Sequence, residues 1–153
     1  MLIEELKIIF IRDLNKLEEE ITLYPEESKL WTVKAEINNS GGNLCLHVTG
    51  SMLHYIGVVL GKTDYVRNRD AEFSQKNIPR SLLIEQVRNT KQIVKTTLEK
   101  MTDADLATEY PVQFLAKHPA INREGMTSGF YLTHMATHLS YHLGQINYHR
   151  RLG

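Results

Sequence analysis

The stretch HMATHLSYHLGQINYHRRLG, residues 134–153, decides the fold expected for this chain. Within it, histidines recur at spacings of four, four and seven among largely apolar neighbours: His134, His138, His142 and His149. If residues 128–151 form a helix, each residue turns by about 100°, so His138 and His142 lie roughly 40° apart on neighbouring turns. A stripe this narrow normally faces the core of a helical domain.

The rest of the chain supplies the partners for such a helix. Apolar residues recur every three or four positions over residues 2–23, 44–60 and 79–101, which predicts three further amphipathic helices. There is no alternating strand pattern and no internal repeat. We therefore expect an all-α fold, a four-helix bundle. Long connections follow the first and third helices, so the bundle could cross over or run up and down.

Length, charge and cysteine content narrow the class of protein. A chain of 153 residues suffices for a single domain over 1–153 with a full hydrophobic core. Its 18 basic and 18 acidic residues balance, and no basic block appears, which argues against nucleic acid and anionic membranes as partners. No apolar run approaches the roughly 18 residues of a membrane span. No signal peptide is recognisable, and the single cysteine, without a CxxC motif, fits the cytoplasm.

The connecting segments carry turn and cap signals. Ser40 or Asn43 is the expected N-cap of the second helix, and Gly61 suits its C-terminal end. Trp31, in the first connection, is expected to be a packing anchor. TDADL, residues 102–106, is a turn signal with Thr102 or Asp103 as a cap.

Two loops hold further polar residues. KTDYVRNRDAEFSQKN, residues 62–77, is expected to be a polar linker of a length that is often functional. Its charged residues could hold an anion, clamp a partner subunit or satisfy one another: Arg67, Arg69, Asp70 and Glu72. His118 lies in an irregular stretch with Pro111 and Pro119 and is expected to be a solvated loop residue.

The histidines support two interpretations. Core or surface imidazoles could be satisfied by hydrogen bonds, since an unpaired buried polar group costs about 1–3 kcal/mol. Alternatively, the inward-facing pair His138 and His142 supplies two nitrogens to a metal, and residues 44–60 offer His47 or His54 as a third. The concentration of histidines on single stripes of two helices favours the metal. Cys45 lies about 160° around the helix from His47 and is expected to be a small core residue.

The ligand types indicate which metals would suit this site. Three neutral imidazoles favour zinc, nickel, iron(II) or copper, whereas calcium and magnesium prefer oxygen. No cysteine or carboxylate shares the same faces, so a fourth protein ligand is not apparent. Three protein ligands with water in the fourth position are typical of catalytic rather than structural zinc.

Two blocks of the sequence closely resemble the DinB-like family, also called YfiT-like metal-dependent proteins. They are NSGGNLCLHVTGSMLHYIGVVLGKTDYVRNRDAEFSQK, residues 39–76, and LTHMATHLSYHLGQINYHRRL, residues 132–152. The resemblance implies a bundle of DinB-like topology, a homodimer, and a divalent metal such as nickel or zinc held by three histidines. Carried onto this chain, His47 takes the position on the second helix, and His138 and His142 precede Gly144-Gln145. His54 then lies about 10 Å from His47 along the helix axis and would line the core or the cavity.

The wider family includes thiol-dependent S-transferases and a mycothiol-dependent maleylpyruvate isomerase. The resemblance therefore permits an enzyme that acts on a small molecule by thiol transfer or isomerisation, with a low-molecular-weight thiol as a partner, and it does not select either reaction. In that interpretation Gln145 and His134 orient the metal-bound group, and Arg67 or Arg69 meets a substrate carboxylate. No general base is identifiable, which weakens a metal-dependent hydrolase. A non-catalytic metal-binding stress-response protein, or a scaffold whose dimer interface is the function, would fit the same residues.

Overall fold

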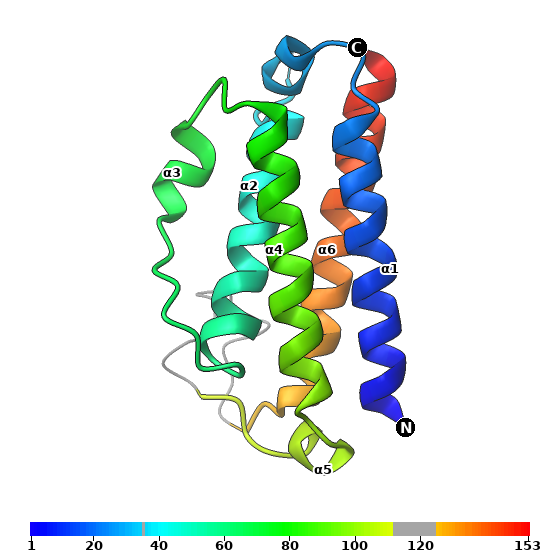
Figure 1. The fold of residues 1–153 in the computed structure, drawn as a ribbon, viewed down its shortest axis with the longest axis vertical. Helices are drawn as coiled ribbons and strands as arrows, with labels where there is room; N and C mark the ends of the chain where they lie inside the picture. Colours follow the sequence, from blue (N-terminus) through cyan, green and yellow to red (C-terminus); the bar gives the residue numbers. More distant parts are fainter. Residues whose placement is uncertain (35, 112–124) are drawn as a thin grey trace.

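Four long helices lie side by side along the long axis of the molecule (Figure 1). The computed structural model describes residues 1–34, 36–111 and 125–153. The helices are α1 (Leu2–Thr22), α2 (Gly41–Met52), α4 (Arg80–Glu99) and α6 (Ser128–Leu152). α1 packs mainly on α4 and α6, and α2 packs on the same two helices. The all-α prediction is confirmed, and α2 and α6, which carry most of the histidines, are neighbours.

The direction of the helices answers the question of connectivity. In Figure 1, α1 and α6 run upward, whereas α2 and α4 run downward. Because α2 and α4 are consecutive long helices that run in the same direction, the chain between them returns along the length of the bundle. This crossover contains the short helix α3 (Arg69–Ser74), which contacts α2. The bundle is therefore of the crossover type.

The predicted apolar stripes form the core. The stripe on α4 is confirmed, since its members are all 0% exposed: Leu83, Val87, Val94 and Leu98. The buried apolar face of α1 shows the same spacing: Ile3, Leu6, Phe10, Leu14, Leu17 and Ile21. Each buried side chain of this kind stabilises the fold by about 1.5–3 kcal/mol. Side chains from all four long helices join in one hydrophobic core.

The second helix differs from its prediction at both ends. Of the two candidate caps, Ser40 is the N-cap, and its hydroxyl accepts a hydrogen bond of 3.2 Å from the Asn43 N–H. The helix starts at Gly41, ahead of the expected residue 44, because the residue that follows the N-cap is the first helical one. Its continuation η2 (Leu53–Val58) is a π-helix, in which the N–H of Gly61 bonds the carbonyl of Ile56 at 2.9 Å. The wider turn redirects the side chains that follow residue 52.

The connections contain more structure than the sequence predicts. Instead of an unstructured linker, residues 62–77 include α3, whose N-cap Asn68 accepts from the Ala71 N–H at 3.0 Å. The TDADL turn is a short helix, α5 (Asp103–Leu106), with Thr102 and Asp105 in a capping box. The η1 turn (Glu27–Trp31) places Trp31 in the core with 8% exposure, which confirms its packing role.

His118 and Pro119 lie outside the described residues. Among the helices that the structure describes, none combines the length and the apolar character that crossing a membrane demands.

Candidate metal centre

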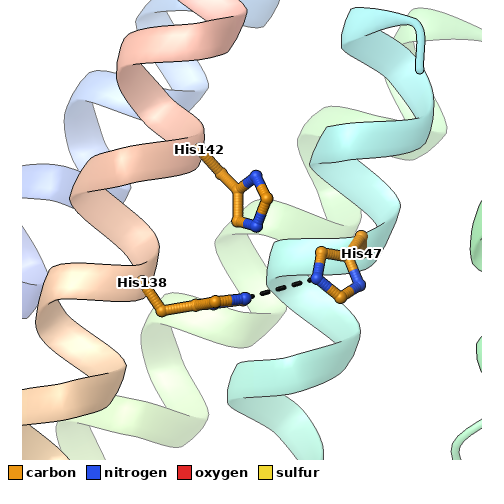
Figure 2. Close-up of side chains that lie close together, drawn as sticks. All are labelled: His47, His138 and His142. Atoms are coloured by element: carbon orange, nitrogen blue, oxygen red, sulfur yellow. Dashed lines mark hydrogen bonds between the residues drawn. The ribbon is translucent and has the colours of Figure 1, made fainter. Parts of the chain in front are cut away.

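Three histidines from two facing helices meet inside the bundle (Figure 2). His47 comes from α2, and His138 and His142 come from α6. Each offers one ring nitrogen, and these three nitrogens lie within 4.8 Å of one another. In the described residues, no other group of three or more histidine, cysteine, aspartate or glutamate side chains is placed in this way.

The local structure of α6 explains why two of the rings converge. His138 and His142 are one turn apart in the middle of a helix of 25 residues, and their ring centroids are 4.5 Å apart. The His47 ring lies 5.2 Å from the His138 ring and 5.0 Å from the His142 ring. His47 is buried, whereas the two rings of α6 are half-buried. The triad is therefore enclosed on the side of α2 and more open along α6.

Hydrogen bonds define the tautomers of two rings. Nδ1 of His47 lies 2.9 Å from Oε2 of Glu72, and an ionised carboxylate only accepts. Nδ1 of His142 lies 2.7 Å from Oε1 of Gln145, an amide oxygen that also accepts. Both Nδ1 atoms therefore carry the proton, which leaves the lone pair on Nε2. In Figure 2 the Nε2 atoms of His47 and His142 point toward the centre of the triad.

His138 completes the triad as a neutral ring. Burial, with the nearby His142 and His47 rings, lowers the pKa of His138 to about 3. Burial also lowers the pKa of His142, although the hydrogen bond to Gln145 opposes this. Neutral imidazole is the form that binds metals. Within the described structure, Nδ1 of His138 is buried without a hydrogen-bond partner.

The spacing of the nitrogens fits a divalent metal. Nε2 of His47 and Nε2 of His138 are 3.3 Å apart. Two nitrogens bound to a tetrahedral zinc ion at about 2.0–2.1 Å are separated by about 3.3–3.4 Å. The nitrogens of His47 and His138 already have that separation, and the nitrogen that His142 offers lies within 4.8 Å of both. The three residues thus form a site that could hold a metal.

A buried carboxylate supports this triad, and sequence reasoning missed its role. Glu72 is 5% exposed, and both its oxygens accept from Arg67: Nε to Oε1 at 2.7 Å and a terminal nitrogen to Oε2 at 2.9 Å. Burial alone would raise the pKa of Glu72, but the hydrogen bonds from His47 and Arg67 and the positive charge of Arg67 lower it overall. The sequence presents Glu72 only as one of several linker charges, because no local pattern shows that the linker folds onto α2.

One residue in the sequence does signal this contact. Gly50 lies one turn after His47 in a helix that is buried throughout. A Cβ atom at Gly50 would collide with the Glu72 carboxylate. A glycine inside a buried helix indicates the close approach of another group, which here is the side chain of Glu72.

The remaining candidate residues have different surroundings. The guanidinium of Arg67 contacts Glu72 and also donates to the Ser51 hydroxyl at 2.9 Å, so it is committed to the protein's own groups. Arg69 is exposed, and its guanidinium carbon lies 5.6 Å from the centre of the Phe73 ring. The hydrogen bonds of Arg67 in the described structure go to Glu72 and Ser51, and none of them reaches the three histidines.

The other polar residues of α2 and α6 flank the triad. The His134 ring is 6.3 Å from the His138 ring, one turn earlier. His54 packs against Tyr55 in η2 at 4.8 Å and lies outside the group of three. His149 lies farther along α6, where its Nδ1 is 2.7 Å from the Tyr24 hydroxyl and its Nε2 is 2.8 Å from the Thr32 carbonyl.

A surface cavity borders the triad. It has a volume of about 800 Å³ and lies between the residues that precede α2 and one face of α6. His142 and Gln145 form part of its wall. Apolar and aromatic side chains supply much of the rest: Ile37, Leu44, Tyr141 and Tyr148. A small molecule in this cavity would lie against the outer side of the candidate metal centre.

The fold and the site together define an all-α bundle with a candidate three-histidine metal centre. The chain matches the model of a family described as a protein of unknown function, DUF1572, over residues 3–152, and it belongs to that family. The match includes all three histidines and Glu72. No curated protein matches the chain.

Proposed function

We propose that this protein is a DinB-like metal-dependent enzyme that acts on a small molecule by thiol S-transfer or isomerisation. The observation that carries the proposal is the convergence of three imidazole nitrogens within 4.8 Å from two facing helices. The resemblance of residues 39–76 and 132–152 to DinB-like proteins supports the same class. The crossover between α2 and α4 is compatible with it.

The donor set indicates the kind of metal. Imidazole nitrogens suit zinc or nickel, and iron(II) or copper are accepted by the same ligands. With three protein ligands, one coordination position is left for water or substrate, as in catalytic zinc sites. A divalent ion held by the three histidines would act as a Lewis acid. It would favour the deprotonated form of a bound water or thiol.

The chain's own groups favour a thiol that comes from outside the protein. Cys45 is 1% exposed, and burial raises the pKa of its thiol to about 12. A buried, protonated thiol is a poor nucleophile. The cavity beside His142 provides a place where an external thiol and its acceptor could bind next to one of the three histidines. Its apolar wall would hold the body of the substrate, and Gln145 would keep His142 in position.

The same contacts weaken a hydrolase function. A hydrolytic site needs a general base within hydrogen-bond reach of the attacking water. Glu72 is the carboxylate that contacts the triad, and its oxygens are occupied by Arg67 and His47. It is therefore a poor base for a water molecule in the cavity.

A substrate screen tests the proposed activity. Zinc- or nickel-loaded protein would be incubated with a panel of electrophilic substrates and several low-molecular-weight thiols. We expect turnover that requires both the thiol and the metal and that is lost in His142→Ala. Metal binding without turnover across the panel would favour the non-catalytic stress-response protein. The homodimer stays a prediction that light scattering of the purified protein tests.

A further inference from the structure

We propose that Glu72 is a positioning residue for His47, holding its ring as the Nδ1–H tautomer with Nε2 available to the metal. This inference rests on the proposed metal centre. Partners of this kind orient metal-binding histidines and make them better donors. The geometry points to Glu72 in this role, and to α3 as the element that carries it.

The contact with His47 is direct and buried. Oε2 of Glu72 lies 2.9 Å from Nδ1 of His47, and the two side chains are 6% and 11% exposed. The ring of Phe73, the next residue in α3, lies 4.9 Å from the His47 ring. The His47 ring is therefore held at its edge by the carboxylate and further restricted by a neighbouring aromatic ring.

The carboxylate itself is held in place from two sides. Arg67 donates to both of its oxygens, a two-point contact that defines the plane of the carboxylate. The same Arg67 terminal group donates to Ser51 on α2 at 2.9 Å. Gly50 leaves the space into which the carboxylate fits.

The backbone of α3 is also tied to α2. The side-chain amide of Asn43 donates to the carbonyl of Glu72 at 2.9 Å and to the carbonyl of Gln75 at 2.8 Å. Asn43 is 0% exposed. Its amide therefore joins the start of α2 to the end of α3, and the backbone of Glu72 is held near His47 independently of its side chain.

Glu72→Gln provides a specific test because an amide has one acceptor and one donor end. If the NH₂ group took the Oε1 position, Nε of Arg67 would lose its acceptor. If it took the Oε2 position, the Arg67 terminal nitrogen would keep Ser51 as a partner, and the NH₂ group would face Nδ1 of His47. The second arrangement leaves fewer donors unpaired, and it turns Nδ1 into an acceptor. The proton of His47 then moves to Nε2, where it competes with a metal.

Glu20→Gln is the matched control. Glu20 is a buried glutamate, 1% exposed, which accepts from Nε of Arg150 at 2.7 Å and from the Asn147 amide at 2.8 Å. It pairs with arginine as Glu72 does, but it contacts none of the three histidines in the described structure. A general effect of neutralising a buried glutamate would appear in both variants.

Two measurements decide the proposal. Long-range ¹H–¹⁵N NMR of the metal-free protein reports the tautomer of His47, and competition with a chromogenic chelator reports the zinc dissociation constant. We expect the Nδ1–H tautomer in the wild type and in Glu20→Gln, and a shift to Nε2–H in Glu72→Gln. Zinc affinity should fall roughly 10–100-fold in Glu72→Gln alone. Circular dichroism verifies that each variant is folded.

The outcomes separate this inference from the proposed function. An Nε2–H tautomer in the wild type would overturn the inference without any variant, even if Glu72→Gln failed to fold. Equal zinc affinities in Glu72→Gln and Glu20→Gln would also overturn it. The wild type could bind no zinc or nickel and still show the Nδ1–H tautomer of His47, with loss of that tautomer in Glu72→Gln. This result would contradict the metal centre and support the positioning of His47 by Glu72.

Discussion

Nε2 of His47 lies 3.3 Å from Nε2 of His138, so two ring nitrogens of different helices face each other inside the bundle. Because Glu72 accepts from Nδ1 of His47, the facing Nε2 of His47 carries a lone pair. A cation bound there would connect α2 to α6. Metal binding and the stability of the bundle should therefore be coupled.

We expect zinc to raise the thermal unfolding midpoint of the wild-type protein. At a free zinc concentration about 100 times the dissociation constant, binding to the folded state adds about 2.7 kcal/mol to the free energy of unfolding. In a domain of this size, this corresponds to a rise of about 5–10 °C. Differential scanning calorimetry with and without zinc measures the rise, and calcium serves as the control ion. An equal rise in His138→Ala would contradict the site.

Gly50→Ala should destabilise the protein, although alanine normally favours a helix over glycine by up to about 1 kcal/mol. The added methyl group would collide with the Glu72 carboxylate. Displacing this carboxylate from Arg67 and His47 should lower the free energy of unfolding by about 1–3 kcal/mol. Urea unfolding measures the change.

Gly144→Ala is the control for this substitution. Gly144 is an exposed residue of α6, where an added Cβ meets no atom within 4 Å. The free energy of unfolding of this variant should rise by about 0.5–1 kcal/mol, because alanine reduces the conformational freedom of the unfolded chain. Stabilisation of both variants would show that the Glu72 carboxylate does not lie against Gly50.

The pairing of Glu20 with Arg150 should make stability depend on acid pH. Burial would raise the pKa of Glu20, but hydrogen bonds from Arg150 and Asn147 and nearby positive charge lower it overall. A carboxyl group with a lowered folded-state pKa contributes stability above its ordinary pKa of about 4.3 and loses it as the pH falls through the lowered value. Glu20→Gln should therefore be less stable than the wild type by about 1–3 kcal/mol at neutral pH.

Urea unfolding of the wild type and of Glu20→Gln between neutral pH and about pH 3 measures how the ionised Glu20 contributes to stability. The difference in the free energy of unfolding should narrow as the pH falls below the ordinary carboxyl pKa. A difference that stayed constant over this range would show that the Glu20 charge is not responsible.

Periodicity predicts the four long helices and two of the three candidate metal ligands. His138 and His142 are related by one helical turn, so their proximity follows from local geometry once α6 is recognised. Spacing could not choose between His47 and His54, because that choice depends on how two helices pack. The resemblance to DinB-like proteins favoured His47, the residue that the structure places with the other two.

The parts that the sequence did not reveal depend on contacts between distant segments. Glu72 reaches His47 only because residues 62–77 fold back along α2, and no local pattern encodes that return. The π-helix η2 at Leu53–Val58 was likewise not predicted, because helix propensity does not distinguish it from an α-helix. Gly50 was the available signal, since a glycine in a buried helix indicates that another group approaches closely.

The metal content of the purified protein tests the central claim most directly. The protein would be made without a histidine tag, loaded with zinc or nickel, desalted and measured by elemental analysis. We predict stoichiometric metal in the wild type, in His54→Ala and in Cys45→Ala, and its loss in His142→Ala. Unchanged metal content in His142→Ala, or no retained metal in the wild type, would contradict the account.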